Sequence, residues 1–165
     1  MKTVLVPTDF NVESLKIIDA LVLTNKPENV AIIFMHAFKL SDSMADMLML
    51  SRRSRDYEKV SDEFYLQMNA YRQKYPKDIR VMGIEYFYGS TVVAFKNFME
   101  GLNADYIAYP KAYDFNPIHK SSIDPRSLTK RCGCEVIELD IYEFSGEEKL
   151  FDTKMPEENV KVLSA

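Results

Sequence analysis

The sequence predicts a single α/β domain, a three-layer sandwich in which helices cover both faces of a five-stranded parallel β-sheet. Short apolar segments alternate with amphipathic ones along most of the 165 residues. The apolar segments have the length and composition of strands buried on both faces, as strands of parallel sheets are. Prolines, asparagines and glycines separate them and mark where each one stops. The resulting β-α-β-α-β-α-β-α-β order requires crossover helices, and so favours a parallel arrangement.

The first two strands flank a short helix. A strand is expected at 3–6, because this apolar segment ends in the turn Pro7-Thr8-Asp9. Asn11 is a suitable N-cap for the helix that follows, whose apolar residues recur every three or four positions until Asn25. The second strand is expected at 30–37, which is apolar almost throughout.

A long helical stretch is expected between Ser41-Asp42-Ser43, which can cap it, and Pro76, which ends it. Its second part carries a clear apolar stripe from Tyr57 to Tyr75. Its first part holds three methionines that suit a pocket, a partner groove, a mobile lid or core packing, and three arginines that suit a solvated face or an acidic or phosphate-bearing partner. These residues are Met44, Met47, Met49, Arg52, Arg53 and Arg55.

The remaining elements follow in the same alternating order. The third strand is expected at 79–88, a helix at 92–102 behind the turn Gly89-Ser90-Thr91, the fourth strand at 104–109, a loop at 111–122, a short helix from Asp124-Pro125 to Cys132, and the fifth strand at 134–139. Residues 141–165 are polar and acidic with scattered apolar residues. We therefore divide the chain into an α/β domain at 1–140 and an acidic C-terminal extension at 141–165.

Composition excludes several functional classes. A net charge of −4 and an isoelectric point near 5.3 do not suit nucleic-acid binding, which needs a basic face. No apolar segment is long enough to cross a membrane, and no export signal opens the sequence. The two cysteines, Cys132 and Cys134, cannot form a disulfide framework or a zinc site by themselves. We expect them to be unreactive, reduced thiols in a cytoplasmic protein.

Five short pieces of the sequence, in matching order, resemble the universal stress protein family. They are Val4 to Phe10, Met35-His36-Ala37, Gly89, Asn103 to Ile107, and Cys134 to Ile137. The resemblance covers residues 2 to 140. It implies the adenine nucleotide alpha hydrolase-like fold with strand order 3-2-1-4-5, and a homodimer that pairs through the fifth strand. We expect the C-terminal extension to take part in that dimer or to contact another protein partner.

The sequence departs from the family where nucleotide-binding members carry G-x-x-G-x9-G-[S/T] after the fourth strand. Pro110 and Tyr113 stand at the first two glycine positions, and the third falls near Ser122. No glycine lies between Leu102 and Gly133, and Pro110 also lacks a backbone donor. We therefore expect a non-enzymatic binding or regulatory module that has no cofactor and does not bind ATP in the usual mode.

The alternative is that the chain binds a nucleotide such as ATP or AMP, or a small anion, in the crevice at the strand ends. The candidate residues are Thr8, Asp9, Ala37, Tyr109, Lys111, Ser121 and Ser122. Asp9 suits either a base or sugar contact or a bracing role in the turn, and Lys111 either an anion contact or a solvated loop position. Ser121 and Ser122 suit an anion site, but capping of the last helix is the expected role.

Catalytic and metal sites are not expected. His36 is assigned to the buried second strand and His119 to the loop, and neither has a serine or carboxylate at a spacing typical of a triad. The S-G-G-x-D-S and H-x-G-H signatures of related nucleotide-binding enzymes are absent.

Overall fold

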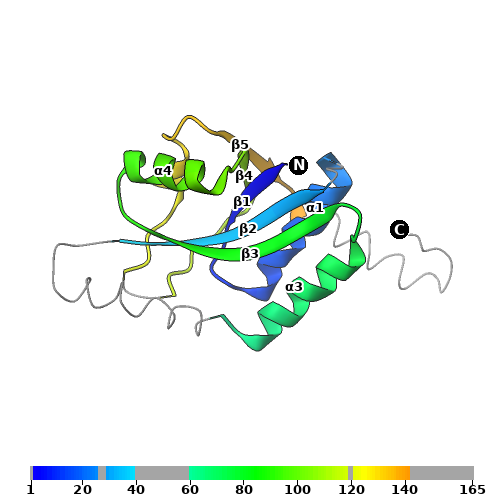
Figure 1. Ribbon diagram of the computed structural model, residues 1–165. Helices are drawn as coiled ribbons and strands as arrows, with labels where there is room; N and C mark the ends of the chain where they lie inside the picture. Colours follow the sequence, from blue (N-terminus) through cyan, green and yellow to red (C-terminus); the bar gives the residue numbers. More distant parts are fainter. Residues whose placement is uncertain (1, 26–28, 40–59, 119–120, 142–165) are drawn as a thin grey trace, which may run out of the picture.

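Five strands form one parallel sheet at the centre of the molecule (Figure 1). They are β1 (Thr3–Pro7), β2 (Val30–Phe38), β3 (Ile79–Tyr88), β4 (Tyr106–Pro110) and β5 (Glu135–Leu139). Their order in the sheet is β3-β2-β1-β4-β5, so the predicted fold class and strand order are confirmed. The computed structural model describes residues 2–25, 29–39, 60–118 and 121–141.

Helices lie on both faces of the sheet, as Figure 1 shows for α4 on one side and α1 and α3 on the other. The helices are the 3-10 helix η1 (Val12–Lys16) and the α-helices α1 (Ile17–Asn25), α3 (Asp62–Lys74), α4 (Val92–Leu102) and α5 (Arg126–Thr129). Side chains of β1 alternate between the two resulting cores, since Val4 and Val6 pack in one and Leu5 packs in the other.

The core under α1 and α3 is rich in aromatic side chains. Phe64 on α3 is fully buried and meets Phe10 and Phe34 edge to face, with ring centroids 5.6 and 5.8 Å apart. The core on the opposite face joins Phe95 of α4 to Leu128 of α5. The two layers leave the carboxyl ends of the strands as the place where loops and functional groups meet.

Two helices differ from their predicted bounds. The helix ending before Pro76 begins at Asp62, because the Ser61 side chain accepts a hydrogen bond from the Phe64 amide at 3.1 Å and caps it. The last helix ends at Thr129 rather than at Cys132. The methionines and arginines of 44–55, His119, and the extension beyond Ile141 lie outside the described residues.

The strand register defines where a site can form. β1 ends at Pro7, opposite Met35, whereas β2 continues for three more residues to Phe38. The strand order reverses between β1 and β4, and the crevice beyond such a reversal is where open parallel sheets bind ligands. β2 therefore presents an open backbone edge toward this crevice, beyond the end of β1. No helix of the described chain is long and apolar enough to cross a membrane.

Candidate functional site at the strand ends

The loop after β4 returns to β2 and fills the edge that β1 leaves open. Ser122 forms an antiparallel bridge with Phe38. The Lys39 amide donates to the Ser121 carbonyl at 2.7 Å, and the Ile123 amide donates to the Ala37 carbonyl at 3.0 Å. Residues 121–123 thus lie beside the end of β2, where β1 no longer pairs with it, and we call the described residues 116–118 and 121–123 the return segment.

Asp9 anchors the other end of the return segment. Its Oδ2 accepts a hydrogen bond from the Asn116 amide at 2.6 Å. Its Oδ1 is buried, accepts no hydrogen bond from the described residues, and lies 3.5 Å from Nδ1 of His36. Burial raises the pKa of the Asp9 carboxyl to about 6, against the lowering effect of the Asn116 hydrogen bond.

His36 links the strand ends to the return segment. Its Nδ1 lies 2.8 Å from the Thr8 carbonyl oxygen, and its Nε2 lies 2.8 Å from Oγ of Ser122. A carbonyl only accepts, so Nδ1 carries a hydrogen, and in the neutral ring Nε2 then accepts from the Ser122 hydroxyl. The ring of Phe115 stacks over the imidazole at a centroid distance of 6.5 Å. The His36 side chain is only 2% exposed, so this link is an interior one.

Thr8 is used by the turn that follows β1. Its amide donates to the Met35 carbonyl at 2.8 Å, which extends the β1–β2 pairing by one bond. Its hydroxyl lies 2.8 Å from Oγ of Ser14 and accepts from the Phe10 amide at 3.0 Å. These bonds hold Phe10 in a left-handed conformation, with φ of 63°, that side chains rarely adopt. The turn therefore fixes where Asp9 points.

A second polar cluster lies beside Asp9. The Tyr109 hydroxyl is 3.0 Å from Oγ1 of Thr129, and burial raises the pKa of Tyr109 above its usual range. The Arg126 guanidinium lies 5.0 Å from the centre of the Tyr113 ring, and its Nε donates to Asp124 at 3.0 Å. Arg126 is thus already paired within the chain, which leaves it less able to bind an external anion.

Lys111 is placed differently from the other candidates. Its side chain is exposed, and its amide donates to the Leu139 carbonyl at 2.8 Å. No contact among the described residues joins its side chain to Asp9. The structure brings Thr8, Asp9, Ala37, Ser121 and Ser122 together, and Tyr109 is buried.

The expected capping role of the two serines is wrong. α5 begins at Arg126 with no side-chain cap, and its short length leaves little to cap. Ser121 and Ser122 pair instead with β2, because that strand has open backbone groups beyond the end of β1. What the alternation of elements does not reveal is that a loop, rather than a neighbouring strand, completes this edge.

The sequence did not reveal a row of three side chains that resembles a catalytic triad, Ser122–His36–Asp9. Its members are separated by 86 and 27 residues, so no local motif announces it. The bonding differs from that of a triad, because the Thr8 carbonyl, not Asp9, holds Nδ1 of His36. Oγ of Ser122 also accepts from the Ile118 amide at 3.2 Å. The signal that could have found part of this row is the parallel register, which places His36 beside Thr8, the residue before Asp9.

The cysteines are not members of the Ser122–His36–Asp9 row. Cys132 is buried and its Sγ donates to the Thr129 carbonyl at 3.1 Å. Burial raises the pKa of Cys134 to about 11, which disfavours a reactive thiolate. Within the described ranges no three histidine, cysteine, aspartate or glutamate side chains are grouped to hold a metal ion.

Comparisons with known proteins agree with this architecture. No protein-family model matches the chain, and neither does any curated protein. Among solved structures, the hypothetical protein PH0823 matches with a TM-score of 0.53 and 15% identity over 84% of this chain and 95% of its own. UspA from Lactobacillus plantarum matches with 0.49 and 15% over 84% and 97%. A universal stress protein from Burkholderia pseudomallei matches with 0.47 and 10% over 83% and 94%.

The chain is therefore an α/β protein whose sheet order reverses at a loop-filled crevice. Its strand order, β3-β2-β1-β4-β5, is the one that the resemblance in sequence to the universal stress protein family implied, and it shares its fold with the hypothetical protein PH0823.

Proposed function

We propose that this chain is a non-enzymatic binding or regulatory module of universal stress protein type that does not bind ATP in the usual mode. One observation carries the proposal: the return segment occupies the strand-end crevice. The Asn116 amide donates a hydrogen bond to the Asp9 carboxylate, and the Ile123 amide donates one to the Ala37 carbonyl. A nucleotide entering the crevice has to break these bonds before it forms its own, which lowers its affinity.

The loss of glycines supports the same proposal. Glycines let a backbone approach phosphates closely, and the segment between Leu102 and Gly133 has none. The helix that follows is a single turn, Arg126–Thr129, and offers little dipole to a phosphate. In this proposal the protein acts through its outer surfaces, by binding partners. It acts in the cytoplasm, where two free cysteines stay reduced.

Calorimetric titration with ATP and with AMP tests the proposal. We expect no binding with a dissociation constant below about 1 mM. A micromolar affinity that disappears in Asp9→Ala, and that persists in the exposed control Asp62→Ala, contradicts it.

A serine-directed fluorophosphonate tests the absence of catalysis. Labelling of wild type that is lost in Ser122→Ala contradicts that part of the proposal.

The second candidate function is nucleotide or small-anion binding at the same crevice. It is favoured by Oδ1 of Asp9, a buried acceptor that receives no hydrogen bond from the described residues. Exposed Lys111 would supply the positive charge after a rearrangement of the loop. This candidate predicts that Lys111→Ala weakens AMP or phosphate binding, whereas Lys77→Ala, an exposed lysine before β3, leaves it unchanged.

Dimerisation through β5 and the C-terminal extension completes the proposal. β5 pairs with β4 on one side, and no described strand pairs with it on the other. Val136 on this strand is 36% exposed, and an uncovered edge with apolar residues favours pairing. Light scattering is expected to show a dimer that Val136→Lys dissociates, and a wild-type monomer at micromolar concentration contradicts this part.

A further inference from the structure

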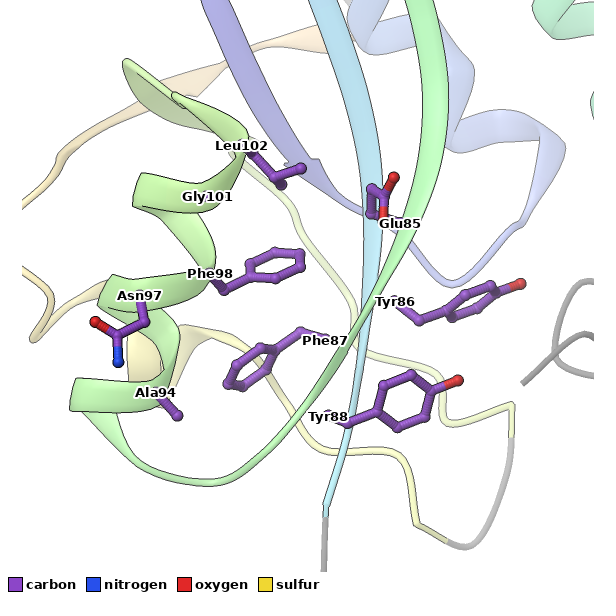
Figure 2. Close-up of a pocket in the computed structure, with 9 residues that line it drawn as sticks. All are labelled: Glu85, Tyr86, Phe87, Tyr88, Ala94, Asn97, Phe98, Gly101 and Leu102. Atoms are coloured by element: carbon purple, nitrogen blue, oxygen red, sulfur yellow. The ribbon is translucent and has the colours of Figure 1, made fainter. Parts of the chain in front are cut away.

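The opposite edge of the sheet carries a groove. β3 pairs with β2 on one side, and none of the described strands pairs with its other side. Between this edge and α4 lies an open groove of about 520 Å³, and Figure 2 shows Phe87, Phe98 and Leu102 around it. Among the described residues that line it, Glu85 is the one charged residue. The groove thus combines a strand edge that no described strand covers with an apolar floor.

Small residues on α4 leave this groove open. Ala94 and Gly101 line it, and a Cβ atom added at Gly101 would meet nothing within 4 Å. The described chain therefore does not fill the space between the helix and the strand edge. A strand edge beside such a space provides backbone hydrogen bonds for an added strand and room for its side chains.

The β3 edge carries charges of both signs and an exposed apolar side chain. Val81 is 42% exposed, an unusual value for a valine in a strand. Arg80 and Glu85 are also exposed, and neither forms an ion pair with a described residue. The β2–β3 register shifts between Val30 and Ala31, so Arg80 has no β2 partner. The two opposite charges lie on either side of Gly83, three residues before it and two after it.

We propose that the β3 edge pairs with the β3 edge of a second copy of this chain, antiparallel about a two-fold axis at Gly83. In this register Val81 lies opposite Glu85 of the second copy, and Met82 lies opposite Ile84. The extra residue at Arg80 brings its guanidinium next to the same Glu85. Diagonal neighbours in antiparallel pairs interact, so Val81 of each copy covers the Phe87 end of the other copy's groove.

Charge complementarity favours a second copy over an unrelated peptide. A two-fold interface has to be self-complementary, and a strand with one cation and one anion about equally far from its centre meets that condition. Bulges and charges also serve to keep strand edges from pairing. Charges of one sign on this edge would prevent pairing. A two-fold pairing instead places Arg80 of one copy next to Glu85 of the other, and it places no like charges opposite each other.

This surface is distinct from the β5 edge of the proposed function. β3 and β5 are the two outer strands of the sheet. If both edges pair, the sheets of successive copies join and the assembly exceeds a dimer. If the β5 pairing fails, the β3 pairing alone still produces a dimer, so the two claims are tested separately.

Charge reversal tests the proposal on the full chain. Sedimentation velocity is measured for Arg80→Glu, Glu85→Arg and the double variant, with Lys96→Glu on exposed α4 as control. We expect each single reversal to raise the dissociation constant at least about tenfold, because like charges then face each other at both symmetric positions. The double variant and the control are expected to stay within about threefold of wild type. Single reversals that leave the association unchanged, or a double variant that fails to restore it, overturn the proposal.

A cross-link tests the register, and it stays informative if a reversal variant does not fold. Residues on a two-fold axis of an antiparallel pair lie about 4.5–5.5 Å apart at their Cα atoms, within disulfide range. Gly83→Cys is therefore expected to form a covalent dimer under mild oxidation, whereas Val81→Cys and wild type do not. Repeating this in the Val136→Lys background separates the two edges. Absence of the Gly83→Cys dimer overturns the proposal. This holds also if the groove binds an unrelated peptide instead.

Discussion

The backbone amide of Asn116 donates a hydrogen bond of 2.6 Å to Oδ2 of Asp9, across a separation of 107 residues. The bond ties the return segment to the end of β1 and closes the crevice at the point where the strand order reverses. It stabilises a carboxylate whose other oxygen is buried without a hydrogen bond from the described residues. Asp9 therefore anchors the return segment, while its burial disfavours the charged carboxylate. The second effect appears in the pH dependence of stability.

The first prediction concerns the pH dependence that Asp9 contributes. Its carboxyl has a pKa of about 6 in the folded chain, because burial disfavours the charged form, against 3.8 as the ordinary value. Between these two values the folded state holds more protons than the unfolded state, so the free energy of unfolding falls as the pH rises. In Asp9→Asn this contribution is absent. From pH 4 to pH 7, wild type is expected to lose about 2 kcal/mol relative to Asp9→Asn.

Urea unfolding of both proteins at pH 4, 5, 6 and 7 measures this difference. Other carboxyl groups titrate in the same range, and taking wild type minus variant cancels their contribution. A difference that stays constant with pH, or that grows in favour of wild type, contradicts the raised pKa.

The second prediction concerns Ser122. Its hydroxyl bonds Nε2 of His36 and accepts from the Ile118 amide, so Ser122→Ala removes both interactions. The variant is expected to lose about 1–2 kcal/mol of stability. Hydrogen exchange is expected to accelerate at the amides of Lys39 and Ile123, which bond across the return segment.

The Gly89 amide provides an internal control for the same experiment. It donates to the Phe38 carbonyl at 2.9 Å, and so bonds the end of β2 without involving the return segment. Its exchange is expected to stay slow in Ser122→Ala. Equal acceleration at all three amides would indicate general loosening of β2 and not release of the segment.

The strands were predictable because each is marked locally. β3 begins and ends where the sequence predicted, at Ile79 and Tyr88, since Pro76 precedes it and Gly89 follows it. The helix start at Ser61 has a local signal too, because Asp62 and Glu63 fill the first turn behind it. The apolar residues from Tyr57 to Tyr75 keep a helical period across Ser61, so the sequence predicted a helix that continues through this position.

The closed crevice was not predictable in the same way. It depends on β2 outlasting β1 by three residues, which is a consequence of strand register and not of local sequence. The return segment has no periodicity, and the partners of Asn116 and Ser122 lie 107 and 86 residues away. The sequence predicts Asp9, Ala37 and Ser122 individually as site residues, but their partners within the chain depend on the three-dimensional pairing.

The third prediction concerns the aromatic core under α3. Phe64 is fully buried and packs edge to face against Phe10 and Phe34. Phe64→Ala is expected to cost about 3–5 kcal/mol through lost contacts and the cavity left behind. Leu66 on the same helix is 69% exposed, and Leu66→Ala is expected to change stability by less than about 0.5 kcal/mol. Similar losses for the two variants in thermal or urea unfolding contradict this packing.

The fourth prediction concerns the tie between α1 and α3. Asp19 on α1 is buried and accepts hydrogen bonds from the Tyr75 hydroxyl and from Nζ of Lys74, the latter at 2.9 Å. Tyr75→Phe removes one donor to a buried carboxylate while it keeps the ring, so a loss of about 1–2 kcal/mol is expected. Tyr65→Phe on the exposed side of α3 is the matched control and is expected to be neutral. If Asp19→Ala also loses stability, and Tyr75→Phe adds little further in that background, the coupling lies in the Asp19–Tyr75 pair. Full additivity of the two substitutions would place the loss elsewhere.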